Sequence, residues 1–256
     1  MLFGREYMPE GAGVDPDAPR KKGAARLLEI LSRDLDGIFL SGTLAMLACA
    51  PAAILAGIAL WLGSLPLCLL AAAAAGWLVG PALTSLYDTI LRALRDEPGF
   101  WWHTYKRVWK QSFKSSLVPG MVFTLLWTLV AYAAFVLPQL TTVSAGFALV
   151  LVVDMVLLLT LGSYYWMQNA LFETSLSQKL SNCVRMFLGF LPRTALSVAF
   201  QLGYWLLMAA VIPRCAFIFL LTGLWVPNLL AALAVYAPIE KSLHLEEQIR
   251  AKQETN

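Results

Sequence analysis

The sequence predicts an all-α, polytopic membrane protein with six transmembrane helices in three hairpins, and three observations lead to this fold class. The composition is 59% hydrophobic and 14% charged, with a mean hydropathy of +0.68, whereas soluble domains carry about 25% charged residues. Long uncharged stretches recur, each close to the roughly 20 residues that cross a bilayer as a helix. The basic residues gather on one side of the topology that these stretches define.

The chain begins with a cytoplasmic leader, residues 1–36, which ends in an expected amphipathic helix. In "AARLLEILSRDLDGIF" the residues Leu27, Leu28, Leu31, Leu35 and Ile38 recur at roughly helical spacing, and charged residues fall mostly between them. Such a pattern is typical of a helix that lies at the membrane surface.

Residues 37–237 form the predicted six-helix transmembrane domain, and residues 238–256 form a cytoplasmic tail. The expected spans are 37–62, 65–87, 117–138, 143–168, 194–212 and 215–237. Within each consecutive pair only two to four residues intervene, so each pair is expected to form a hairpin. Gly80 and Pro81 are expected to bend or end the second span near its cytoplasmic face.

The basic residues give an independent test of this topology. Of the 19 Lys and Arg residues, 18 lie in the leader, the two long connections and the tail, and only Arg214 lies in a short turn. Because positively charged loops stay in the cytoplasm, both termini are predicted to be cytoplasmic.

The connection 88–116 mixes aromatic and basic residues and is predicted to contain a second interfacial helix. Its aromatic side is expected at headgroup level and its basic side toward anionic lipid. A plain aromatic belt beside a span is the alternative. Stacking on single-stranded nucleic acid would use similar residues, but the membrane already explains them, so no nucleic-acid partner is expected. The predicted residues for the membrane interface or for partner docking are Trp101, Trp102, Tyr105, Lys106, Arg107, Trp109 and Lys110.

Two segments carry a family resemblance. "GPALTSLYDTILRALRDEPGFWWHTYKRVWKQSFKSS" and the leader "FGREYMPEGAGVDPDAPRKKGAARLLEILSRDLDGIF" resemble the YesL-like bacterial integral membrane proteins over about residues 1–120. The resemblance implies a multi-pass protein of the bacterial cytoplasmic membrane, often encoded beside carbohydrate ABC-transporter and sensor genes, with no established activity. Where relatives often carry Asn in the basic helix, this chain has Gln111 and Ser112.

Asp154 is the charged residue that lies deepest in a predicted span. Gln201 and Asn228 occupy comparable depths in their own spans, so the three side chains could share one polar layer. An acid at this depth must be protonated or paired, which suggests a proton, cation or sugar-hydroxyl site. The alternative is a neutral acid that is hydrogen-bonded between helices and only holds them together.

No other pattern indicates catalysis, a cofactor or a metal. The cysteines Cys49, Cys68, Cys183 and Cys215 show no paired spacing and are expected to be small packing residues, although a disulfide between Cys68 and Cys215 stays open. The phosphate-binding, dinucleotide-binding and nucleophile-elbow motifs are absent from the sequence. The protein is therefore expected not to be an enzyme, and to need no cofactor and no metal.

Two functions remain. The first is a non-catalytic accessory or scaffold subunit that docks onto ABC-transporter permease or sensor subunits, which the resemblance suggests. The alternative is a small secondary transporter with Asp154 at its site. The lipid bilayer is an expected partner in both cases, and the Ala- and Gly-rich second span also allows a homo-oligomer.

Overall fold

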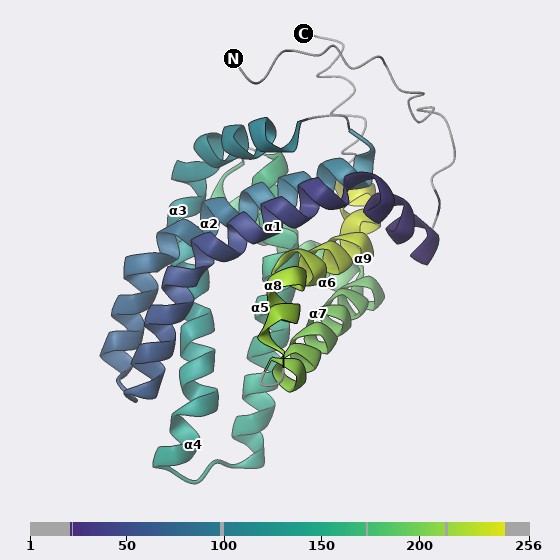
Figure 1. Ribbon diagram of the computed structural model, residues 1–256. Helices are drawn as coiled ribbons and strands as arrows, with labels where there is room; N and C mark the ends of the chain where they lie inside the picture. The colour runs from purple at the N-terminus through teal and green to yellow at the C-terminus, as the bar shows by residue number, and fades with distance from the viewer. Residues whose placement is uncertain (1–20, 22, 98–99, 173, 213–214, 244–256) are drawn as a thin grey trace, which may run out of the picture.

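The computed structural model of the chain is all α-helical over the residues that it describes, which are 21, 23–97, 100–172, 174–212 and 215–243 (Figure 1). The helices are α1 (Ala24–Trp61), α2 (Leu65–Arg95), α3 (Trp101–Phe135), α4 (Leu137–Leu140), α5 (Ala145–Leu171), α6 (Leu176–Gly189), α7 (Leu191–Val211), α8 (Ala216–Thr222) and α9 (Trp225–Leu243). The predicted turn 213–214 and most of the predicted leader and tail lie outside the described residues.

Five helical stretches are long and apolar enough to cross a membrane: α1, α2, α3 together with α4, α5 and α7. They contain five of the six predicted spans, and the all-α, multi-pass prediction is confirmed at this level. The sixth predicted span, residues 215–237, is divided into the short helix α8 and the longer helix α9.

Three helices extend well past the predicted limits of their spans. The leader helix and the first span form one continuous helix, α1, and the aromatic–basic stretch continues without a break into the third span as α3. Helix α2 does not end at Gly80–Pro81 but continues to Arg95. Hydropathy marks where a helix leaves the apolar layer, whereas the helix itself continues as long as its backbone hydrogen bonds can form.

Helices α2 and α3 approach each other very closely at three glycines. A Cβ atom added to Gly80 would collide with the backbone carbonyl of Ser116 in α3, and one added to Gly120 would lie 2.5 Å from the backbone nitrogen of Gly80. One turn earlier in α2, a Cβ on Gly76 would lie 2.9 Å from the Cα of Met121. Gly76 and Gly80 form a Gly-x-x-x-Gly pair, and small residues at this spacing let two helix backbones meet.

The break between α8 and α9 occurs at Gly223, whose backbone has φ 43° and ψ −141°. This left-handed region favours glycine because a Cβ atom would be strained there. The Tyr204 hydroxyl of α7 donates a 2.6 Å hydrogen bond to the Gly223 carbonyl, and the Asn228 amide donates one of 2.6 Å to the Leu224 carbonyl. Carbonyls freed by an interrupted helix need such partners in an apolar environment.

The helices form two groups that meet at α5. Helices α1, α2 and α3 pack along one another, and α7 packs with α9. Helix α5 contacts members of both groups and passes between them in Figure 1. The largest fully buried side chains include Tyr87 of α2 and Tyr164 and Trp166 of α5. A cavity lies between these groups.

Candidate functional site

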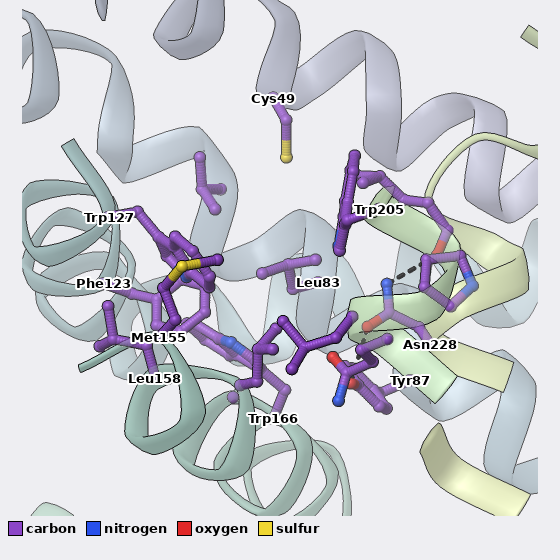
Figure 2. A pocket seen from close by; sticks show the side chains of 17 residues that line it. Cys49, Leu83, Tyr87, Phe123, Trp127, Met155, Leu158, Trp166, Trp205 and Asn228 are labelled. Carbon is purple, nitrogen blue, oxygen red and sulfur yellow. Dashed lines mark hydrogen bonds between the residues drawn. The ribbon is translucent and has the colours of Figure 1, made fainter. Parts of the chain in front are cut away.

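A half-enclosed cavity of about 400 Å³ lies between the two helix groups (Figure 2). Phe123, Trp127 and Met155 lie on one side of it in this view, and Trp205, Tyr87 and Asn228 lie on the other. The full lining is Cys49, Val79, Leu83, Tyr87, Phe123, Trp127, Met155, Leu158, Leu159, Gly162, Trp166, Gln201, Leu202, Trp205, Leu224, Pro227 and Asn228. The wall is mostly apolar, with few polar groups.

Asn228 holds the start of α9 against α2. Its side-chain oxygen accepts a 2.7 Å hydrogen bond from the Tyr87 hydroxyl, while its amide nitrogen donates a hydrogen bond to the Leu224 carbonyl. The Asn228 side chain therefore supplies a hydrogen bond to a backbone carbonyl at the α8–α9 break and also joins α9 to α2. The sequence pointed to Asn228 but did not indicate its partner Tyr87.

Gln201 joins α7 to α5 in a similar way. Its amide nitrogen donates a 2.9 Å hydrogen bond to the Ser163 hydroxyl, and Ser163 in turn bonds the Leu159 carbonyl of its own helix. Gln201 is buried, and its side-chain oxygen accepts no hydrogen bond from the described residues. Gln201 also lines the cavity.

Asp154 does not join this pair. The cavity is lined by the next residue, Met155, but not by Asp154. The Asp154 side chain is half-buried, nine residues or about 14 Å after the start of α5, and it makes no hydrogen bond or ion pair with a described residue. The structure thus brings Gln201 and Asn228 to one cavity and leaves Asp154 outside its lining.

A buried polar connection near the other end of α5 was not anticipated. Asn169 of α5 donates a 2.9 Å hydrogen bond to the Thr84 hydroxyl of α2 and accepts one of 2.7 Å from the Lys179 ammonium of α6. The sequence analysis placed Lys179 in a cytoplasmic connection, yet it is only 3% exposed. The sequence does contain a pattern that indicates this burial, because Lys179, Cys183 and Met186 recur at helical spacing and form the buried side of α6.

Cys183 on the same side of α6 is inert by its surroundings. Burial raises the pKa of its thiol to about 12, although a 3.3 Å hydrogen bond from the Gln168 amide acts in the opposite direction. The four cysteines are all free, including Cys68 and Cys215, so the structure contains no disulfide between that pair. Among the described residues no group of three or more His, Cys, Asp or Glu could hold a metal ion.

Asp96 is the centre of a charged cluster that ties α1 to the end of α2. Its carboxylate accepts a 2.8 Å hydrogen bond from Arg26 and a very short one from Arg33. The same arginines donate to the Leu94 and Ala93 carbonyls at the end of α2. Burial alone would raise the pKa of Asp96, but the hydrogen bonds and charges of both arginines outweigh it and hold the pKa below its ordinary value.

The aromatic residues at the start of α3 face the protein more than was expected. Tyr105 is buried and Trp109 packs against the core, whereas the sequence placed them at headgroup level. Trp101 packs against α1, because a Cβ atom added to Gly37 of α1 would lie 3.2 Å from the Cβ atom of Trp101.

Trp102 is 40% exposed, and the Lys106 ammonium lies 4.8 Å from the centroid of its ring. Lys106, Arg107 and Lys110 are also exposed. Trp102 and these three basic residues, named here the α3 basic surface, are therefore the part of the predicted interface that stays accessible.

These features define the class of the protein: it is a multi-pass helical membrane protein with a charged cluster at one end and an apolar cavity inside. The family described as "Protein of unknown function, DUF624" matches residues 55–133, about a third of the chain. Neither the curated proteins nor the solved structures contain a match. The matched region runs from the last two turns of α1 to near the end of α3 and so includes the close contact of α2 with α3.

Proposed function

We propose that this protein is a non-catalytic accessory subunit of the bacterial cytoplasmic membrane, which docks onto carbohydrate ABC-transporter permease or sensor subunits. In this proposal the chain crosses the membrane six times. The five membrane-length helices are supplemented by α8 with α9, and both termini are cytoplasmic. The charge distribution of the sequence supports that orientation.

The observation that carries the proposal is the firmly held α3 basic surface. The Asp96 cluster fixes the N-terminal part of α1 against the end of α2, and Trp101 packs the start of α3 onto α1. A surface that is rigid before binding loses little entropy when a partner binds. Trp and Arg are also enriched where protein interfaces concentrate their binding energy. The choice of partner rests on the YesL-like resemblance.

Co-purification from native membranes tests the accessory role. We expect the wild-type chain to recover permease or ATPase subunits in stoichiometric amounts and Arg107→Glu to lose them. Lys241→Glu is the matched control, because Lys241 is exposed at the end of α9, far along the chain from the α3 basic surface. Recovery of the wild-type chain alone, as a homo-oligomer, would contradict the proposal.

A second candidate function, a small secondary transporter, is favoured by the half-buried carboxyl group of Asp154. An acid in a membrane helix with no partner among the described residues is usually functional. We expect Asp154→Asn to abolish proton- or ion-coupled uptake in proteoliposomes while expression stays normal. An unchanged flux would exclude the transporter function through this residue.

A further inference from the structure

The cavity between the two helix groups has the size of a small-molecule site and has no role in the accessory function. Its volume of about 400 Å³ falls within the range of roughly 300–1,000 Å³ that is usual for ligand pockets. Residues from six helices line it, namely α1, α2, α3, α5, α7 and α9. The side chains around a half-enclosed cavity lack packing partners on that side, and a ligand would supply them.

Flat aromatic side chains keep the cavity open. Phe123 packs edge-on against Trp127 and Trp166, with ring centroids 6.2 and 5.6 Å apart. Gly162 makes room for Phe123, because a Cβ atom there would lie 3.0 Å from the end of the phenyl ring. Rings that support one another in this way cannot easily collapse into the space beside them. The wall opposite Phe123 includes the ring of Trp205 (Figure 2).

The polar groups of the lining describe the ligand's charge and its hydrogen bonding. The lining contains no Asp, Glu, Lys or Arg, so the site is suited to an uncharged molecule. Trp166 is only 1% exposed, and its indole N–H has no hydrogen-bond partner among the described residues. A buried donor without a partner is unfavourable, and an acceptor on a ligand would remove this cost.

We propose that this cavity binds an uncharged quinone-type ring from the bilayer, with a ring carbonyl that accepts the hydrogen bond of the Trp166 indole. The flat apolar ring suits the aromatic walls, since such rings favour offset or edge-on packing. A saturated acyl chain would fill the space but would leave the indole N–H unpaired. The cavity is lined mainly by the membrane-length helices, so its ligand is expected to be lipid-soluble.

The test uses the purified full-length chain in detergent with tetramethyl-1,4-benzoquinone, a tail-free ring whose carbon positions are all substituted. We expect saturable binding, detected as a concentration-dependent rise in the unfolding temperature. Trp166→Phe keeps the ring but removes the donor and should weaken binding about 3- to 10-fold. Trp61→Phe is the matched control, because Trp61 is 86% exposed and outside the cavity, and it should bind like the wild type.

A second variant keeps the test decisive if Trp166→Phe does not fold. Leu83 lies in the middle of the lining (Figure 2), and Leu83→Phe should narrow the space and weaken saturable binding. The proposal is overturned if the wild-type chain does not bind the quinone, or if Leu83→Phe binds it with unchanged affinity. Binding of palmitate in place of the quinone would also overturn it and identify an acyl chain as the occupant. None of these outcomes depends on the co-purification result.

Discussion

Asp96 combines an unusual backbone with two strong charge interactions. It ends α2 in the left-handed region, with φ 62° and ψ 27°, a conformation that Asp tolerates better than most residues. Arg26, which it pairs with, is only 6% exposed. Removing the carboxylate would leave a buried guanidinium without this partner, which is more unfavourable than the loss of a surface ion pair.

The first prediction is that Asp96→Asn destabilises the protein by about 1–3 kcal/mol, because hydrogen bonds to charged groups contribute that much. Asn keeps the size and the tolerance for left-handed backbone, so the effect isolates the charge. The measurement is thermal unfolding in detergent. Asp36→Asn is the control, since Asp36 is exposed, and a similar loss in both variants would contradict the prediction.

The second prediction concerns pH. Because the folded state holds the pKa of Asp96 below its unfolded value of about 3.9, its contribution is complete above that value and is lost as the pH falls through the folded pKa. The stability difference between wild type and Asp96→Asn should therefore be constant from pH 7 to about 5 and shrink below about 4. Unfolding measured over this pH series checks it, and a difference that grows with acidification would count against it.

Single residues were predicted unevenly from the sequence. The depth argument selected Gln201 and Asn228, because polarity and depth can both be read from the chain. Both residues line the cavity, and their role in binding stays a prediction. Asp154 was grouped with them because depth says nothing about the direction in which a helix turns its side chains. Lys179 was assigned to a solvated connection because its charge was considered without the spacing of its apolar neighbours.

The contact between α2 and α3 depends on the absence of side chains at three positions. Gly80 and Gly120 meet backbone to backbone, so a methyl group at either position would push the helices apart along their shared length. Van der Waals packing is a main source of helix association in lipid. The matched segment 55–133 includes both glycines.

The third prediction is that Gly80→Ala destabilises the protein strongly and lowers the yield of folded chain. The added Cβ would collide with the Ser116 carbonyl, which is backbone and cannot rotate away. Gly57→Ala provides the control, since a Cβ there meets nothing within 4 Å and Ala is about 1 kcal/mol better than Gly in a helix. Thermal unfolding of the two variants should therefore move in opposite directions, and equal stability would refute the close contact.

At the level of elements, hydropathy located the membrane-length helices but missed two of their properties. Helices α1, α2 and α3 continue through Pro51, Pro81 and Pro119. The sequence did not indicate this continuity, because a proline is tolerated inside a membrane helix only when neighbouring groups satisfy the freed carbonyls. The α8–α9 break was not visible either, since Gly223 is one glycine among 17. Only the partners Tyr204 and Asn228 reveal its role.

The whole molecule is polarised along the predicted membrane normal. The Asp96 cluster lies at the end of α2 and the α3 basic surface lies at the start of α3, while the α1–α2 turn and the turn after α4 lie toward the opposite end of the molecule (Figure 1). The sequence predicted a charged cytoplasmic end because charged and apolar segments are separated along the chain, and the orientation in the membrane stays a prediction. It could not indicate the cavity, which forms from residues on six helices.

The fourth prediction tests the orientation of the molecule in the membrane. In a Cys215→Ser background, Thr142→Cys should react with a membrane-impermeant maleimide on intact cells, because the turn after α4 is expected outside. Gln111→Cys, on the exposed side of α3, should react only after permeabilisation. Labelling with the reverse pattern would place the α3 basic surface outside the cell and would invalidate the proposed orientation.

The Gly-x-x-x-Gly face of α2 also limits how two copies of the chain could associate. In α2 that face is already occupied by α3 of the same molecule, so a second copy cannot use it. Self-association would have to use other exposed sides of the helices, which present bulky residues such as Leu47, Leu149 and Leu206. Such surfaces compete with lipid tails on nearly equal terms. Any homo-oligomer is therefore expected to dissociate or associate depending on the lipid or detergent that surrounds it.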